Sequence, residues 1–274
     1  MGQSTHPVTI VIPIYADWRS IKQCVRSVIR HTDPKHKVLI INDNGPDADT
    51  IERTLMKSIS HADNIRYYRN NKNLGFVKTC NKAAYELDNA DNDMLLLNSD
   101  TKVTAGYLDD LQAVLDDNPA IAAVSPRSNN ATIATIPLSA IKKRRSISKR
   151  ASYRAFKKLS PSLPQYNIAP VAHGFCMLIR RSIINDIGLF DEVFGRGYGE
   201  EVDFCMRASQ HGYLCAISNK SFVFHLGARS FKSDTKKELV NKHSVIITER
   251  YPDFDEVVRD YYIKNSLLES RLGK

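Results

Sequence analysis

Five side chains in this sequence combine reactive chemistry with informative positions: Asp43, Asp100, Glu200, Glu201 and His225. Each aspartate comes after an apolar run, the two glutamates follow a glycine-rich stretch, and the histidine ends another apolar run. Carboxylate and imidazole groups can bind divalent cations, take up protons and accept hydrogen bonds. Taken singly, such an aspartate is also typical of a turn or a helix cap. The surrounding elements must decide between these interpretations.

Strand-like apolar runs alternate with segments of helical spacing before Pro126. The expected strands are residues 8–12, 38–41, 65–68, 94–97 and 121–124, and the expected helices are residues 21–29, 50–60, 76–87 and 105–117. This alternation is typical of βαβ units and predicts an α/β fold with a mainly parallel central sheet flanked by helices. Ligands bind such sheets at the carboxyl ends of the strands. The prediction places Asp43 and Asp100 at that edge.

The second half follows a different pattern, because the regular alternation stops at Pro126. We expect the proline-bracketed segment 138–160 to be either an insertion with short helices or a mobile excursion. After it we expect an ordered segment at 174–179, a glycine-rich loop at 195–199 and a helix start at 200–204. Short strands up to 222–225 should follow, and then a helical tail from 233 that Pro252 divides into two helices.

Composition indicates a soluble, globular chain of 274 residues with 42% hydrophobic content. No apolar run approaches the roughly 20 residues of a membrane span, and residues 1–6 lack the order of a signal peptide. The five cysteines form no Cys-x-x-Cys pair, which fits a reducing compartment. We therefore expect a cytoplasmic protein with core cysteines.

The net charge of +9 is concentrated in one segment. Residues 138–160 contain nine lysines and arginines and no acid, so the rest of the chain is electrically balanced. A general nucleic-acid-binding surface is therefore disfavoured, although Tyr153 and Phe156 leave a small basic nucleic-acid module as an alternative. We expect no nucleic-acid partner. The same charges could instead make peripheral contact with an anionic inner membrane surface.

Short motifs now stand in one order along the chain. They are Val-Ile-Pro-Ile-Tyr at 11–15, Asn-Asp-Asn at 42–44, Asn-Leu-Gly-Phe at 73–76, Leu-Asn-Ser-Asp at 97–100, His-Gly-Phe-Cys at 173–176, Phe-Asp-Glu-x-Phe at 190–194, Glu-Glu-Val-Asp-Phe-Cys-x-Arg at 200–207 and His-Leu-Gly at 225–227. This ordered set resembles the GT-A-fold glycosyltransferases of family 2, particularly their polysaccharide-assembling, rhamnosyltransferase-like members.

The resemblance implies a nucleotide-sugar donor site in the first half of the chain. It assigns Pro13, Tyr15 and Asp43 to the base and ribose, and Asn73 and Lys78 to the diphosphate. Turn formation remains an alternative for Asp43, and an ordinary capped helix start for the segment after Asn73.

The same resemblance implies a metal site. Asn98, Ser99 and Asp100 match the family's metal motif, with asparagine in place of its usual first carboxylate, so Asn98 and Ser99 are assigned to the nucleotide. Asp100 and His225 are the implied ligands of Mn²⁺ or Mg²⁺, and an imidazole ligand favours Mn²⁺. A core histidine is the alternative for His225.

The acidic cluster matches the element that supplies the family's catalytic base. The matching position is Glu201, where the family has aspartate, so Glu200 and Asp203 stay candidates as well. A helix start that favours acids is the alternative. The acceptor-binding residues implied by the resemblance are His173, Gly174 and Phe175.

The expected activity is metal-dependent, inverting transfer of a sugar from a UDP- or dTDP-sugar to a hydroxyl of a glycan or lipid-linked glycan in bacterial surface polysaccharide synthesis. We expect a glycosyltransferase domain at 1–232, with a donor half at 1–125 and a catalytic half at 126–232, followed by a helical segment at 233–274. A nucleotidyltransferase is a weaker alternative, because no glycine-rich phosphate loop lies near residue 15. The glycine-rich loop at 195–199 joins no strand to a helix, which disfavours a dehydrogenase.

Overall fold

A computed structural model describes residues 6–138, 148–227 and 233–272. Its strands are β1 (Val8–Ile14), β2 (Lys37–Asn42), β3 (Ile65–Arg69), β4 (Asp93–Leu97), β5 (Thr101–Val103), β6 (Ile121–Arg127), β7 (Tyr166–Ala169), β8 (Cys176–Ile179) and β9 (Leu214–His225). Its α-helices are α1 (Trp18–His31), α2 (Ala48–Ile59), α3 (Phe76–Lys82), α4 (Tyr107–Asp117), α6 (Lys149–Leu159), α7 (Arg181–Ile187), α8 (Glu200–Gln210), α9 (Ser233–Arg250) and α10 (Phe254–Leu272).

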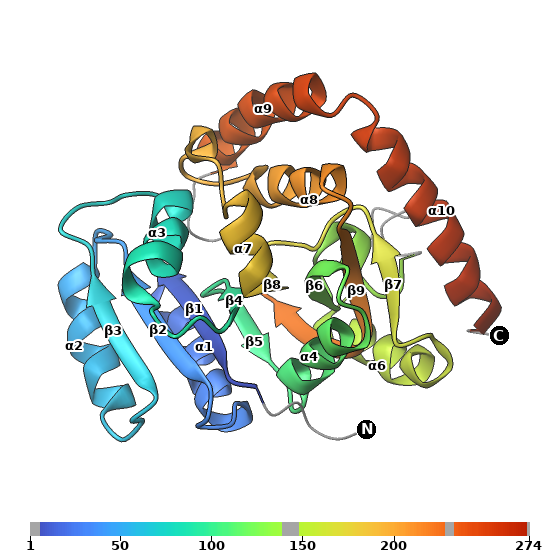
Figure 1. The fold of residues 1–274 in the computed structure, drawn as a ribbon. Coiled ribbons are helices and arrows are strands. Elements are labelled where there is room, and N and C mark those ends of the chain that lie inside the picture. Colours follow the sequence, from blue (N-terminus) through green and yellow to red (C-terminus); the bar gives the residue numbers. More distant parts are fainter. Residues whose placement is uncertain (1–5, 139–147, 228–232, 273–274) are drawn as a thin grey trace.

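One mixed sheet runs through the molecule in the order β3-β2-β1-β4-β8-β6-β9-β5, with β7 paired to β9 (Figure 1). The first four strands in this order are parallel, whereas β8 lies antiparallel between β4 and β6. Strands β1, β2 and β4 are almost entirely buried, which explains their continuous apolar runs. The predicted α/β class and the parallel first half are confirmed.

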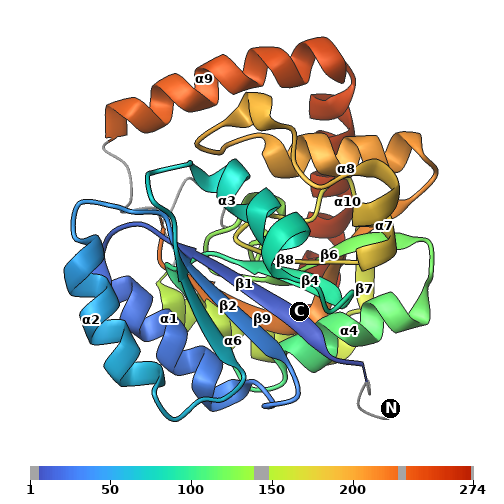
Figure 2. The same cartoon turned by 60° about the vertical axis from the view of Figure 1, so that its left-hand side comes forward.

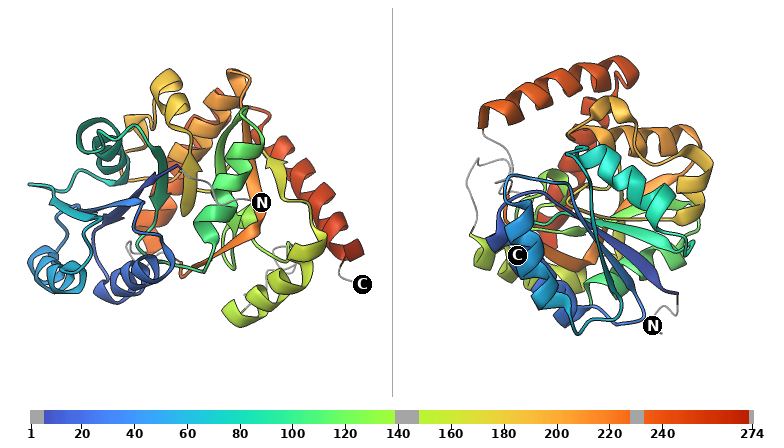
Figure 3. Two further views of the ribbon diagram at one scale, coloured as in Figure 1. Left: turned by 60° about the horizontal axis from the view of Figure 1, so that its bottom comes forward. Right: turned by 90° about the vertical axis from the view of Figure 1, so that its left-hand side faces the viewer.

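Helices cover both faces of the sheet. Helices α1 and α2 lie on one face, and α3, α7 and α8 lie on the other (Figures 2 and 3). Helix α1 shows why: Ile21, Cys24, Val25 and Val28 recur at helical spacing and are all buried. All five cysteines are buried and free, as expected for core positions.

The strand register brings the reactive segments to one edge. Ile14 at the end of β1 pairs with Asn42 at the end of β2, and Thr101 in β5 pairs with His225. The turns after β1 and β2 cross so closely that a Cβ on Gly45 would lie 1.8 Å from the Tyr15 carbonyl oxygen. Only glycine fits there, so this crossing positions the segments after both strands.

Several elements differ from the sequence-based expectation. Strands β5 and β7 were not predicted, and residues 214–225 form one long strand in place of several short ones. Pro126 lies inside β6, next to a register shift against β9, because an irregular position tolerates a missing N–H. Helix α3 ends at Lys82 and continues as a π-helical turn, Ala83–Leu87.

The described part of the basic segment forms helix α6, which packs onto Phe222 of β9 through Phe156 and Leu159. The segment therefore contains a short helix, whereas Lys142, Lys143, Arg144 and Arg145 lie outside the described residues. Among the described helices, none combines the length and apolar character required to cross a membrane.

Two long helices end the described chain and divide at Pro252, as predicted (Figure 1). Arg250, at the end of α9, reaches Asp203 of α8, with its NH1 2.7 Å from Oδ1. In α10, Glu269 lies 3.5 Å from the buried guanidinium of Arg127 in β6. Both helices are thus tied to the sheet domain by buried carboxylates.

Candidate active site

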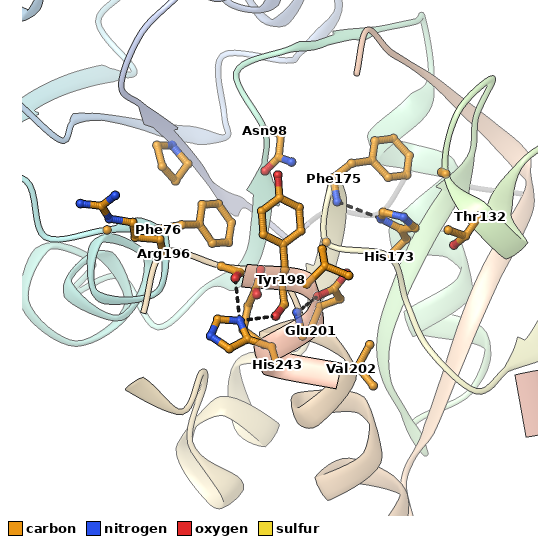
Figure 4. Close-up of a pocket in the computed structure, with 18 of the residues that line it drawn as sticks. Phe76, Asn98, Thr132, His173, Phe175, Arg196, Tyr198, Glu201, Val202 and His243 are labelled. Atoms are coloured by element: carbon orange, nitrogen blue, oxygen red, sulfur yellow. Dashed lines mark hydrogen bonds between the residues drawn. The ribbon is translucent and has the colours of Figure 1, made fainter. Parts of the chain in front are cut away.

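A cleft of about 620 Å³ opens at the carboxyl edge of the sheet, between the ends of β1, β2 and β4 and the helices α8 and α9 (Figure 4). Every site residue predicted from the sequence lines this cleft except Lys78 and Asp203. The structure therefore brings together segments from position 13 to position 225, and it adds a wall from α9 that the sequence did not indicate.

Asp43 lies buried behind the donor side of the cleft. One of its carboxylate oxygens accepts hydrogen bonds from the Asn70 side chain and the Leu74 N–H, both at 2.8 Å, and the other accepts from the Gly75 N–H at 2.9 Å. Charge-assisted hydrogen bonds of this kind are strong. Asp43 therefore holds the loop before α3 in place while it also lines the cleft.

That loop presents Asn73 to the cleft, next to the entry of α3. Gly75 has φ +85°, and a Cβ there would lie 3.0 Å from the Gly195 carbonyl oxygen, so the loop also fits tightly against the segment before α8. Lys78 is not brought to the cleft. Its half-exposed ammonium pairs with Glu192 at 3.3 Å, one helical turn beyond the loop.

Asp100 and His225 face each other across the end of β5. The Nε2 atom of His225 lies 3.4 Å from Oδ2 of Asp100, and both side chains are mostly buried. The Nδ1 atom lies 2.6 Å from the carbonyl oxygen of Asn130. Because a carbonyl only accepts, Nδ1 donates this hydrogen bond, and Nε2 faces the Asp100 carboxylate.

This arrangement fits a divalent cation. A histidine that ligates a metal through one nitrogen usually donates its other N–H to a carbonyl or carboxylate, as His225 does to Asn130. Phe175 stacks on the imidazole at 5.1 Å between ring centroids and fixes its plane. The described residues contain no group of three or more His, Cys, Asp or Glu side chains able to hold a metal, so a cation here would need further oxygen ligands.

Two adjacent glutamates begin α8 at the far side of the cleft. Glu200 is buried, and its Oε2 has no hydrogen-bond partner among the residues that the structure describes. Burial and the neighbouring Glu201 carboxylate raise the pKa of Glu200 well above its usual value. Burial also raises the pKa of Glu201, while backbone amides, among them those of Gly199 and Gly174, act in the opposite direction.

Glu201 is the more accessible of the pair. Its Oε2 accepts a hydrogen bond from the Gly199 N–H at 3.4 Å, and its stem packs against Gly174, where a Cβ would lie 3.4 Å from that of Glu201. A carboxylate with a raised pKa and access to a cleft can serve as a general base.

Asp203 is not brought into the cleft. It is fully buried on the opposite side of α8, where Arg207 bonds one oxygen at 2.9 Å. Its other oxygen accepts from Arg250 at 2.7 Å and from the Tyr251 hydroxyl at 2.9 Å. The helical spacing explains this result, because two residues along a helix turn a side chain by roughly 200°.

The predicted acceptor segment, residues 173–175, lines the cleft beside both the Asp100–His225 pair and Glu201. The His173 Nδ1 lies 3.4 Å from the Phe175 N–H, and the ring centroids of His173 and His225 are 6.4 Å apart. Burial, together with the nearby His225, lowers the pKa of His173 to about 3. His173 is therefore neutral at physiological pH and accepts a hydrogen bond.

Some cleft residues were missed by the sequence analysis. Phe76, Arg196 and Tyr198 line the cleft, and Figure 4 shows the Tyr198 ring projecting towards Asn98. Burial and the carboxylates of Glu200, Asp100 and Glu201 raise the pKa of Tyr198. The glycine-rich loop around it was a usable signal, because three glycines beside an acidic pair indicate an unusual backbone.

The chain was compared with known proteins. The family described as Glycosyl transferase family 2 matches residues 9–188, more than half of the chain. A low-salt glycan biosynthesis hexosyltransferase, Agl10 of Haloferax volcanii, is 46% identical over 54 residues. That match spans only 18% of this chain and 17% of the relative.

Solved structures with low sequence identity share the fold. A mannosyltransferase from Pyrobaculum calidifontis, in complex with GDP-Man and Mn²⁺, gives a TM-score of 0.64 at 14% identity, covering 96% of this chain and 74% of that one. Residues 1–349 of TarS from S. aureus, in complex with UDP-GlcNAc, give 0.56 at 14% identity, covering 93% and 71%. GalNAc-T7 with UDP, GalNAc and Mn²⁺ gives 0.62 at 16% identity, covering 80% of this chain and 44% of that one.

These neighbours confirm the predicted GT-A fold. Together with the cleft geometry, the match over residues 9–188 leads to one conclusion: the chain belongs to glycosyltransferase family 2 and has the glycosyltransferase fold.

Proposed function

We propose that this glycosyltransferase moves a sugar from a UDP- or dTDP-sugar to an acceptor hydroxyl, with a divalent cation and with inversion at the anomeric carbon. The observation that carries the proposal is the shared cleft: the Asp100–His225 pair and the Glu201 carboxylate both line it.

The donor wall supports a nucleotide. Pro13, Tyr15 and Asn73 lie at or beyond strand ends, where backbone and amide groups can hydrogen-bond a base, a ribose or phosphate oxygens. Asn98 and Ser99 continue this wall towards Asp100. Asp43 contributes by fixing the loop that carries Asn73.

Asp100 and His225 would hold the cation, and the imidazole favours Mn²⁺ over Mg²⁺. When bound, such a cation supplies positive charge beside the diphosphate. The Asn130 carbonyl and the Phe175 ring keep His225 oriented for this role, so little ordering is needed when the donor enters.

Glu201 takes the proton in the transfer step. The acceptor oxygen attacks the anomeric carbon, its proton passes to the Glu201 carboxylate, and the bond from that carbon to the diphosphate oxygen breaks with its electron pair leaving on the diphosphate. A single displacement inverts the configuration. We prefer Glu201 to Glu200, whose carboxyl is buried, and to Asp203, whose oxygens are held by Arg207, Arg250 and Tyr251.

A screen of nucleotide sugars tests the donor and the cation. The purified chain is incubated with UDP-, dTDP- and GDP-sugars, with Mn²⁺, with Mg²⁺ or with a chelator, and released nucleotide is measured. We expect hydrolysis of a UDP- or dTDP-sugar that needs the cation and falls by at least about 10²-fold in Asp100→Ala. The exposed Asp63→Ala serves as the matched control. Full activity of Asp100→Ala in chelator contradicts the metal assignment.

The acceptor side of the proposal places the enzyme in bacterial surface polysaccharide synthesis, on a glycan or lipid-linked glycan. Helix α6 supports contact with an anionic membrane surface, because Arg150, Arg154, Lys157 and Lys158 recur at helical spacing on its exposed face, opposite the buried Phe156. Each basic residue near anionic lipid contributes about 1 kcal/mol.

Vesicle binding tests this contact. Replacing Arg150 and Arg154 with serine should weaken binding to phosphatidylglycerol vesicles at low salt by roughly 30-fold, from about 2 kcal/mol. Arg53 and Lys57, exposed and also one turn apart on α2, form the matched control pair. Equal losses in both pairs, no vesicle binding by the wild type, or tighter binding to single-stranded RNA contradicts the membrane proposal.

A further inference from the structure

The loop that leads into α8 has an unusual backbone. Gly197, Tyr198 and Gly199 all have positive φ, at +110°, +72° and +110°. Glycine adopts this region freely, but a tyrosine there is strained. The loop sets the direction of Tyr198 into the cleft, and the Gly199 N–H donates to Glu201 at 3.4 Å. Something outside the loop must stabilise this conformation.

A histidine on the C-terminal helix α9 makes that contact. The Nδ1 atom of His243 lies 3.0 Å from the Gly197 carbonyl oxygen and 2.8 Å from that of Tyr198 (Figure 4). Both partners are acceptors, so Nδ1 is the donor and carries the proton. The ring meets Phe194 edge to face at 5.4 Å, and His243 is 3% exposed.

The position of His243 in α9 is informative. Among the side chains that the structure describes on this helix, only His243 and Ile247 are buried, one turn apart, and both line the cleft. An apolar residue would satisfy packing alone. A buried imidazole that donates to two successive carbonyls instead matches the polar groups that the left-handed loop exposes.

The end of α9 is fixed to the same part of the fold. Arg250 bonds Asp203 at 2.7 Å and Asp191 at 2.9 Å, and the Tyr251 hydroxyl bonds Asp203 at 2.9 Å. These contacts hold α9 against α8 and against the segment before it. The imidazole is thereby held at a defined distance from the loop.

We propose that His243 is a positioning residue for the catalytic base. It acts through the carbonyls of Gly197 and Tyr198, which hold Gly199 where its N–H orients the Glu201 carboxylate. The inference rests on the proposed function, because Glu201 must be the base for its orientation to affect the rate. Helix α9 then contributes a residue to the active site, although it lies beyond residues 9–188, which match the family.

The test measures hydrolysis of the nucleotide sugar found by the donor screen, with kcat and donor KM determined separately. His243→Leu keeps the bulk but loses the donor, and we expect kcat to fall by about 10- to 100-fold, the scale of a misplaced catalytic group. Donor KM should stay within about twofold, because the donor wall is untouched. His243→Asn places an amide N–H near the position of Nδ1 and should keep kcat within roughly threefold of the wild type.

His211 supplies the matched control. It is exposed at the end of α8, and its Nδ1 contacts a single carbonyl, that of Arg207, at 2.9 Å. His211→Leu should leave both constants unchanged. Should His243→Leu fail to fold, Gly199→Ala perturbs the same contact, because a Cβ there would lie 3.0 Å from the Phe194 ring and 3.5 Å from the Cβ of His243. We expect from it the same loss of kcat at constant KM.

The outcomes separate the two proposals. Unchanged kcat in His243→Leu, equal losses in the Leu and Asn variants, a rise in KM that accounts for the loss, or an equal loss in His211→Leu would each overturn the role of His243. A wild-type chain that hydrolyses none of the nucleotide sugars refutes the proposed donor chemistry instead.

Discussion

The carboxylates on the two sides of the cleft have different surroundings. On the donor side, Asp43 accepts hydrogen bonds from three donors, two of them backbone N–H groups of the loop before α3. On the α8 side, one Glu200 oxygen has no hydrogen-bond partner among the described residues, and Glu201 accepts a long hydrogen bond from the Gly199 N–H. Both glutamates have raised pKa values as a result of burial.

This difference separates a carboxylate that organises a loop from one that is suited to exchange a proton. The three hydrogen bonds hold the Asp43 carboxylate in place against the loop before α3. Burial favours the neutral form, so the Glu201 carboxylate is suited to take a proton from the acceptor. The surroundings of each carboxylate, and not the residue type alone, therefore distinguish the two sides of the cleft.

The largest expected effect comes from Glu201→Gln. The amide cannot take up a proton, so the hydrolysis or transfer rate should fall by at least about 10²-fold. Affinity for UDP or dTDP with Mn²⁺, measured by calorimetry, should stay within about twofold, because the proposed base acts on the acceptor hydroxyl and not on the nucleotide. If Glu200→Gln, and not Glu201→Gln, separates rate from affinity in this way, the base is Glu200.

The pH dependence of the reaction provides the next test. A raised Glu201 pKa means that the base is protonated, and inactive, at pH values where an ordinary glutamate is already ionised. On the acid side kcat/KM should fall about tenfold per pH unit, with its midpoint above the ordinary value of 4.5. The midpoint is obtained from rates between pH 4 and 8. A midpoint at or below 4.5 contradicts a buried base.

Asp43→Asn tests the organising carboxylate. The amide nitrogen would face a backbone N–H in place of an acceptor, so we expect a loss of about 1.5–3 kcal/mol in unfolding free energy. Donor affinity should weaken in parallel, because Asn73 lies on the loop that Asp43 holds. Urea unfolding and nucleotide titration measure the two effects. Weakened donor affinity at unchanged stability would instead indicate that Asp43 acts mainly through the ligand.

Glu200→Gln should have the opposite effect on stability and increase the unfolding free energy above pH 4.5. The folded state holds the Glu200 proton above the ordinary pKa of 4.5, whereas the unfolded state releases it. This group therefore makes the protein less stable as pH rises from 4.5 towards the raised value, by up to about 1.36 kcal/mol per pH unit. The Gln variant should match the wild type near pH 4.5 and melt at a higher temperature at pH 8. Thermal unfolding at both values checks this; a less stable variant at pH 8 contradicts it.

Much of this cleft follows from local sequence patterns. The buried runs of β1, β2 and β4 predict a parallel sheet, and a parallel sheet by itself places Asp43 and Asp100 at one edge. Such inferences succeed where the position of a residue depends only on the strand that precedes it. The end of an apolar run did not by itself place His225 at that edge; that assignment came from the resemblance to the family.

Other features depend on contacts between distant segments, which no local pattern records. Strand β5 has only three residues and exists because β9 pairs with it. The contact of His243 with a loop 45 residues earlier leaves no trace in the periodicity of α9. Asp203 reads like its neighbours Glu200 and Glu201, and only the placement of Arg250 and Tyr251 shows that it belongs to the packing of α9.

The smallest expected effect concerns Lys78, which the motif comparison assigned to the diphosphate and the structure places outside the cleft. Its ammonium is about half exposed and pairs with Glu192, which is 59% exposed. Exposed pairs of this kind contribute about 0–1 kcal/mol, so Lys78→Ala should change the unfolding free energy by less than about 1 kcal/mol. Donor KM should change by less than about twofold, since a screened charge outside the cleft adds little to binding. Asn73→Ala, from the same motif but lining the cleft, should raise donor KM several times more. A larger KM effect for Lys78 than for Asn73 would mean that the lysine leaves Glu192 and turns to the diphosphate when the donor binds.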